Sequence, residues 1–230
     1  MNILQEFDTI TAIATPLGTG GVGVIRISGA DSFNIMSKIF SKQNLVPGKI
    51  AHGWIVDEGK KIDEVIVLPF KNPHSYTGED VIEIHCHGGI NVVKNILDLV
   101  LKSGARMAER GEFTKRAFLN KKLDLSQAEA VADLIHAKTQ NFAVQSAKNL
   151  SGVLRDKILE IKSEIFNTLS RIVAGIDFPE DVAEPEYEFL IKSFKKSLNE
   201  IDEILLCAKS SDILRQGIKV AIVGRPNVGK

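Results

Sequence analysis

The residues whose spacing points most directly to chemistry form the run GRPNVGK, from Gly224 to Lys230. They match G-x-x-x-x-G-K, a loop whose backbone N–H groups and lysine hold phosphate groups. The apolar run Val220–Val223 before it predicts a buried strand. The Ser or Thr that would hold Mg²⁺, and the helix that would complete the anion site, would have to follow Lys230, the last residue. We interpret the run as the start of a truncated nucleotide-binding domain, with a chance match as the alternative.

A second glycine-rich run, GTGGVG at residues 18–23, matches the dinucleotide fingerprint G-x-G-x-x-G. That fingerprint requires a helix after the loop, whereas the following residues VGVIRIS alternate as in a strand. The dinucleotide interpretation therefore fails, and a turn between two strands is expected. Arg26 lies in the second of these strands, where it would face either solvent or a carboxylate-bearing ligand.

The run DVIEIHCHGG carries a third candidate site. Alternation on a strand places Glu83, His85 and His87 on one face and the apolar residues on the other. Three readings remain open: a zinc site, a half-buried strand with a polar face, or a small-molecule pocket. In the last, Glu83 and His87 would form hydrogen bonds and the glycines would allow close backbone approach.

Residues 110–135 are rich in charge and lie where the pattern of the chain changes. Lys115, Arg116, Lys121 and Lys122 form a basic cluster that is either a solvated surface or part of an anion site. Beside a pocket, Lys122 could reach an anionic ligand. A few lysines are weak support for nucleic-acid binding.

The composition is that of a folded globular protein. Hydrophobic residues make up 44% and charged residues 25%, and the formal net charge is zero. This balance argues against disorder and against general attraction to nucleic acid or membranes. Two cysteines, Cys86 and Cys207, are too few for a disulfide framework and favour a reducing, cytosolic setting. No signal peptide or membrane-spanning run is expected.

The elements that must position these candidates fall into two halves. Residues 1–119 read as mixed strand and helix, because short β-branched runs alternate with two segments of helical spacing. The expected strands are 8–15, 22–28, 52–57, 64–70 and 80–87, and the expected helices are 30–40 and 91–104.

From Asp124 onward the pattern is helical. Ser126 and Glu129 match an S-x-x-E capping box before a long helical stretch. One apolar stripe runs from Leu150 to Ile172, with Gly152 as the place where the helix would bend or break.

The run GIDFPED then interrupts the helix, and a second stripe follows to Ala208. Two amphipathic helices do not close a bundle by themselves. We therefore expect their apolar stripes to need partners, either from sequence after Lys230 or from a second chain.

Several of these runs together resemble one family, the tRNA-modifying GTPases MnmE, also called TrmE. They are ATPLGTGGVGVIRISG, SYTGEDVIEIHCHGG, RGEFTKRAFLNKKLDLSQAEAVADLI, GIDFPED and GIKVAIVGRPNVGK. The resemblance implies an α+β fold in three parts: a mixed folate-binding and dimerisation domain similar to the glycine-cleavage T-protein (1–119), part of an all-α helical domain (120–216), and the first strand of a truncated P-loop GTPase domain (217–230).

The resemblance also implies a function. In the family, a homodimer joined through the N-terminal domains works with the flavoprotein MnmG on C5 of the wobble uridine of tRNA. The carbon comes from 5-formyl- or 5,10-methylene-tetrahydrofolate, and GTP hydrolysis requires potassium and magnesium. The present chain would bind folate and dimerise in the cytoplasm without hydrolysing GTP.

Site residues are carried over by position. Arg26, Glu83 and Lys122 match the family's folate contacts: the two cations suit the glutamate carboxylates of folate, and Glu83 suits the N–H edge of the pterin. Asn227 matches a potassium ligand. The expected GTP-binding residues are Gly224, Arg225, Pro226, Asn227, Val228, Gly229 and Lys230.

Two functions of other classes remain as alternatives. One is a free-standing folate-dependent aminomethyltransferase, against which the helical second half argues. The other is a structural module that dimerises and keeps only a vestigial folate pocket.

Overall fold

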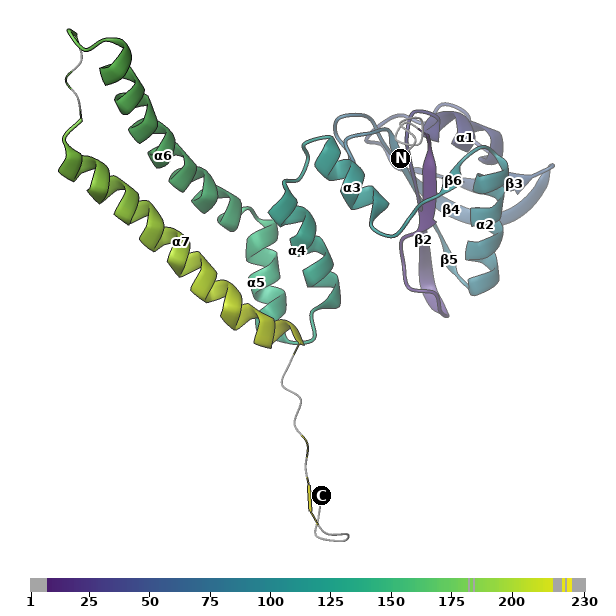
Figure 1. Ribbon diagram of the computed structural model, residues 1–230. Helices are drawn as coiled ribbons and strands as arrows, with labels where there is room; N and C mark the ends of the chain where they lie inside the picture. The colour runs from purple at the N-terminus through teal and green to yellow at the C-terminus, as the bar shows by residue number, and fades with distance from the viewer. Residues whose placement is uncertain (1–7, 182, 184, 217–220, 222, 225–230) are drawn as a thin grey trace. The chain divides into compact units, whose positions relative to one another are not determined.

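The computed structural model describes residues 8–181, 183, 185–216, 221, 223 and 224, and the side chains only as far as residue 208 within the last helix (Figure 1). The chain divides into two compact units, residues 1–123 and 124–230. The first unit is a mixed sheet with helices and the second is helical, which confirms the expected fold class. The sequence placed the boundary after residue 119, and the first unit also includes the turn that follows its last helix.

Within the described residues the first unit contains a six-stranded sheet in the order β3-β4-β5-β2-β1-β6. All neighbouring strands pair antiparallel except β1 and β6. The strands are β1 (Ile10–Ile13), β2 (Gly20–Ser28), β3 (Ala51–Asp57), β4 (Lys60–Phe70), β5 (Val81–Gly88) and β6 (Arg106–Met107). The five strands expected from alternation are confirmed, whereas the two-residue β6 is too short to show a period.

The inner face of the sheet is covered by α1 (Ser32–Ile39) and α2 (Ile90–Lys102). Alternate strand residues such as Ile25, Ile27 and Ile84 are fully buried against the apolar stripes of these helices. Burying each such side chain contributes about 1.5–3 kcal/mol, so this cluster is the main source of stability of the unit.

Gly23 lies where β2 passes beneath α2. A Cβ atom placed there would stand 2.4 Å from Cγ2 of Val93, so no larger residue fits without displacement. The glycine-rich run thus lets a helix approach a strand closely, and it joins β1 to β2 as expected.

The outer face of the sheet is polar in its middle. Arg26 and Glu83, opposite each other on β2 and β5, point to this face because their neighbours Ile25 and Ile84 point inward. Part of the outer face is covered by the loop of residues 71–80 and by α3 (Glu112–Leu119). The sequence did not predict α3, since its charged residues mask the apolar period.

The second unit begins with α4 (Leu125–His136) and α5 (Gln140–Leu150), which lie side by side (Figure 1). The capping box expected at Ser126 is wrong. Asp124 is the N-cap, its carboxylate accepts a hydrogen bond from the backbone N–H of Gln127, and the Gln127 side chain accepts from the backbone N–H of Asp124. Aspartate and glutamine satisfy the helix end as Ser and Glu would, so the register moves by two residues.

Two breaks interrupt the expected long helix. Ala137 is extended and Thr139 caps α5 by accepting from the N–H of Phe142. Gly152 adopts a left-handed φ of 96° and begins α6 (Val153–Asp177), which confirms a break at this glycine. The first break was not expected from the sequence.

The long helices α6 and α7 (Tyr187–Gln216) form a hairpin around the run GIDFPED (Figure 1). Their apolar stripes are largely uncovered: Phe166 is 63% exposed and Leu169 51%. Among the described residues no helix combines the length and apolar character needed to cross a membrane. The expected strand at Val220–Val223 is not among the described elements, because Val220 and Ile222 lie outside the described residues and Ala221 and Val223 have no regular structure.

Candidate ligand-binding site

An ion pair on the outer face of the sheet brings two expected site residues into contact. Nη2 of Arg26 lies 2.7 Å from Oε1 of Glu83, and Nε donates to the same oxygen at 2.8 Å. The strand register places the two residues directly opposite each other. Their side chains keep 24% and 19% exposure, so the pair is sheltered but reachable by a ligand.

Two aromatic rings flank this pair. The guanidinium carbon of Arg26 lies 5.0 Å from the ring centre of Tyr76 and 5.6 Å from that of Phe113. Both distances suit cation–π attraction, which holds the flat guanidinium in one orientation. Tyr76 comes from the loop 71–80 and Phe113 from α3, and the hydroxyl groups of Tyr76 and Thr114 share a 2.9 Å hydrogen bond.

Glu83 has a second partner on the same strand. Its Oε2 lies 3.4 Å from Nε2 of His85, while Oε1 is held by Arg26. The carboxylate is therefore held from both oxygens, with lone pairs left to accept donors from a ligand. A flat heterocycle that presents adjacent N–H groups matches such a carboxylate.

Lys122, the third expected site residue, does not contact the pair. Its Nζ donates to the backbone oxygen of Pro73 at 3.0 Å, and its stem packs beside Gly78. Lys122, in the turn after α3, therefore contacts the loop 71–80 that also carries Tyr76. The structure joins Arg26 to Glu83, and it brings Lys122 to this loop and not to the pair.

The zinc reading of the EIHCH strand finds no support in the geometry. Nδ1 of His87 lies 2.7 Å from Oδ1 of Asp63, and the backbone N–H of His87 donates to Oδ2 at 2.8 Å. His85 instead faces Glu83. Within the described part of the chain, no group of three or more potential ligands is arranged to hold a metal ion.

A cavity of about 180 Å³ lies beside the glycine-rich loop. Glycines and apolar side chains line it, among them Leu17, Gly20 and Val93, and neither Arg26, Glu83 nor Lys122 does. It lacks charged groups that would fix the orientation of a polar ligand, so we do not place the ligand there.

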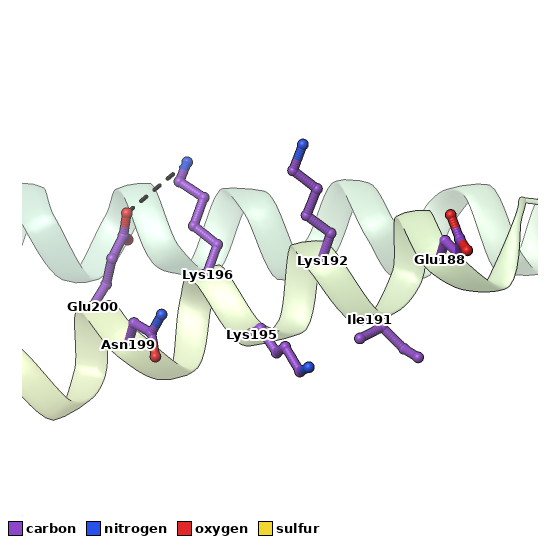
Figure 2. A pocket seen from close by; sticks show the side chains of 7 residues that line it. All are labelled: Glu188, Ile191, Lys192, Lys195, Lys196, Asn199 and Glu200. Atoms are coloured by element: carbon purple, nitrogen blue, oxygen red, sulfur yellow. Dashed lines mark ion pairs between the residues drawn. The ribbon is translucent and has the colours of Figure 1, made fainter.

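A cavity of about 530 Å³ lies along α7 (Figure 2). Lys192 and Lys196 point to one side of the helix and Ile191 and Lys195 to the other, and Nζ of Lys196 lies 3.9 Å from Oε1 of Glu200. Because these side chains spread along one helix and do not converge, the hollow is a surface groove with no fixed arrangement of ligand-binding groups.

A buried charge network supports the aromatic walls. Arg116, only 5% exposed, bonds Asp8, Glu79 and Glu112, and Arg106 bonds Asp8 and Glu112. Hydrogen bonds from Arg106 and Arg116 lower the pKa of Asp8 despite partial burial. Burial raises the pKa of Glu112, but its bonds to Arg106, to the N–H of Glu109 and to Arg116 outweigh this and leave the pKa below its usual value.

Sequence reasoning missed Tyr76, Phe113 and the network. It placed Arg116 in a basic cluster that was either a solvated surface or part of an anion site, and neither interpretation predicts a buried residue. An arginine one helical turn after Glu112 was the available signal for an intrahelical pair, which the structure has at 3.1 Å.

Most of the expected phosphate loop lies outside the described residues. Gly224 has no regular structure, and Arg225, Pro226, Asn227, Val228, Gly229 and Lys230 are not described. Their assignment to GTP, and that of Asn227 to potassium, stay predictions from the sequence.

Comparison with protein families accounts for almost the whole chain. Residues 9–122 match the model of the GTP-binding protein TrmE N-terminus, and residues 125–221 match that of the MnmE helical domain. These bounds meet at the division between the two compact units.

Individual relatives carry the same name. Proteins called tRNA modification GTPase MnmE are 46% identical over 224 residues in Thermotoga maritima, 47% over 235 in Streptococcus thermophilus and 49% over 233 in Streptococcus mutans. The alignments cover 97–100% of this chain and 50–52% of each relative, so the chain spans about half their length. The chain therefore belongs to the MnmE (TrmE) family, of which it carries the N-terminal and helical domains.

Proposed function

We propose that the first unit binds a one-carbon tetrahydrofolate, either the 5-formyl or the 5,10-methylene form, at the Arg26–Glu83 pair. The observation that carries this proposal is a fixed, partly exposed carboxylate beside two aromatic rings. Rings bind the flat face of a pterin and a carboxylate binds its N–H edge. The cavity beside the glycine-rich loop has no charged lining residue, and the side chains of the groove along α7 do not converge.

The contact between Arg26 and Glu83 changes the roles expected from the sequence. The glutamate tail and the pterin are opposite ends of folate, so two residues 2.7 Å apart do not each hold a different end. We assign Glu83 to the pterin edge and Arg26 to holding Glu83 in place. Lys122, which contacts the loop that carries Tyr76, is then the cation for the glutamate carboxylates.

For the longer protein to which such domains belong, we propose a GTPase that modifies tRNA. It would act on C5 of the wobble uridine together with the flavoprotein MnmG, as a homodimer joined through the N-terminal domains. Residues from Gly224 to Lys230 would begin its GTP site, with potassium at Asn227 and magnesium beyond. The names of the relatives support the GTPase and tRNA parts of this proposal. A cytoplasmic location follows from a tRNA substrate.

Calorimetric titration of this chain with 5-formyltetrahydrofolate tests the folate site. We expect saturable binding that Arg26→Ala and Glu83→Gln each weaken at least tenfold, since each removes a charge-assisted contact worth about 1.5–3 kcal/mol. Arg110→Ala is the matched control, because Arg110 is an exposed arginine of the same unit. A folded chain that does not bind, or that binds equally well in all variants, would refute the site.

A further inference from the structure

We propose that Arg116 is a positioning residue that holds Tyr76 and Phe113 against Arg26. It acts through buried ion pairs that tie the loop 71–80 and α3 to the outer face of the sheet. The ligand named in the binding test rests on the proposed function, whereas the positioning itself rests on the contacts alone.

Arg116 joins three parts of the first unit at one point. Its Nη1 donates to the backbone oxygen of Asp8 at 2.7 Å and to both oxygens of Glu79 at 3.1 and 3.2 Å. Its Nη2 donates to Oδ1 of Asp8 at 2.9 Å and to Oε1 of Glu112 at 3.1 Å. A lysine cannot make these bonds together, since the planar fork of arginine is what reaches the separate acceptors.

Glu79 carries the connection to Tyr76. Its Oε2 accepts from the hydroxyl of Ser28 at 2.6 Å, and that hydroxyl lies 2.7 Å from the hydroxyl of Thr77. Ser28 and Thr77 are fully buried, so this contact fastens the loop onto β2. Tyr76 precedes Thr77, and its ring is therefore placed over Arg26 by an anchor that includes Arg116.

The connection to Phe113 runs along α3. Phe113 and Arg116 belong to the same helix, and Glu112 of that helix bonds both Arg116 and Arg106. The bonds to Asp8 therefore hold the first turns of α3 to the segment before β1. Asn120, just after α3, donates to the backbone oxygen of Thr77 at 2.7 Å. This bond links α3, which carries Phe113, directly to the loop that carries Tyr76.

Replacing Arg116 with lysine keeps one positive charge, but a lysine cannot bond Asp8, Glu79 and Glu112 together. Asp8 and Glu112 stay paired with Arg106, whereas Glu79 is held by Arg116, so Glu79 is the carboxylate most free to turn away when that contact weakens. The loop would then loosen at Tyr76 while the apolar core on the inner face stays unchanged. Ligand affinity would fall more than global stability does.

The first test needs no ligand. Aromatic rings shield a guanidinium stacked on them, so the Arg26 Nε–Hε signal in an NMR spectrum reports the two rings. We expect Arg116→Lys to move this signal toward its position in the double variant Tyr76→Leu/Phe113→Leu. Arg110→Lys, the exposed control, should leave it in place. An unchanged signal in folded Arg116→Lys would overturn the proposal.

The second test separates positioning from general destabilisation. Arg116→Lys should weaken 5-formyltetrahydrofolate binding at least tenfold in the wild-type background and less than twofold in the Tyr76→Leu/Phe113→Leu background. Equal losses in both backgrounds would contradict an action through the rings.

Two outcomes of these tests, a variant that does not fold and a wild-type chain that does not bind folate, call for a different measurement. If Arg116→Lys does not fold, Glu79→Gln replaces it, since it keeps the size of the side chain and removes the charge that Arg116 holds. If the wild-type chain does not bind the folate, the proposed function fails, and the Arg26 signal alone decides the positioning.

Discussion

The two units of this chain use their apolar residues in opposite ways. In the first, isoleucines of the sheet such as Ile25, Ile27 and Ile84 are fully buried beneath two helices. In the second, Phe166 and Leu205 are more than half exposed on a helical hairpin, and a groove of about 450 Å³ between α6 and α7 is lined almost entirely by apolar residues. A unit with a closed core resists unfolding by itself, whereas amphipathic helices obtain most of their stability from packing that covers their stripes.

This difference sets where the site can be built. A fixed ion pair and two aromatic walls require a rigid support, and the sheet with its buried core provides one. The hairpin offers lysines on one exposed helix, and their side chains point in different directions (Figure 2). Rigid support is what separates a binding site from a charged surface.

The largest effect that would sharpen the comparison comes from truncating one apolar residue in each unit. Ile84→Ala should destabilise the first unit by about 2–5 kcal/mol, because it leaves a cavity in a closed core. Phe166→Ala, on an exposed stripe, should change stability by about 0.5 kcal/mol or less. Trp54, the one tryptophan of the chain, lies in β3, so its fluorescence reports the first unit in urea titrations, whereas far-ultraviolet circular dichroism follows the helices of the second unit. Similar losses of stability in both variants would contradict the difference between a closed core and an exposed stripe.

A smaller effect is expected at the start of the helical unit. Asp124→Ala should cost about 0.5–2 kcal/mol, because it removes the N-cap of α4. Ser126→Ala should cost less, since that hydroxyl donates to the Asp124 side chain and does not itself cap the helix. Far-ultraviolet circular dichroism during thermal unfolding measures both. If Ser126→Ala lowered the stability more than Asp124→Ala, the capping box expected at Ser126 would be right after all.

The smallest and most gradual effect is a dependence on pH in the first unit. The pKa values of Asp8 and Glu112 are lower in the folded state than their ordinary values of 3.8 and 4.5. A lowered pKa stabilises the fold above the unfolded value and loses that contribution as the pH falls through the folded value. The urea midpoint of Trp54 fluorescence should therefore be steady above about pH 5 and fall below pH 4.5, and Glu112→Gln should flatten the fall. A midpoint that rises on acidification would contradict the network.

Much of the fold could be predicted from local patterns. Alternation located the five longer strands and the period of 3.6 located α1, α2, α6 and α7, because each of these elements buries one face along its own length. Short or charged elements could not be found this way. The residues of α3 that contact the unit are largely charged, and its helical period is visible only once Arg116 and Glu112 are known to be buried.

The candidate site was predicted in part. Arg26 and Glu83 were identified by their position in strands and by the family resemblance, and the structure brings them together. Tyr76 and Phe113 could not be found from spacing, since they come from a loop and a helix far apart in the sequence. Their meeting depends on the long-range bonds of Arg116.

By itself, the sequence determined the family, the order of mixed and helical parts, the strand that carries Glu83 and the break at Gly152. These depend on residue type, spacing and local backbone preference. Only the tertiary structure decided that Arg26 binds Glu83, that Lys122 contacts the loop 71–80 and that Arg116 is buried. Such facts depend on which distant residues come within a few ångströms, and this follows from the packing of the whole unit.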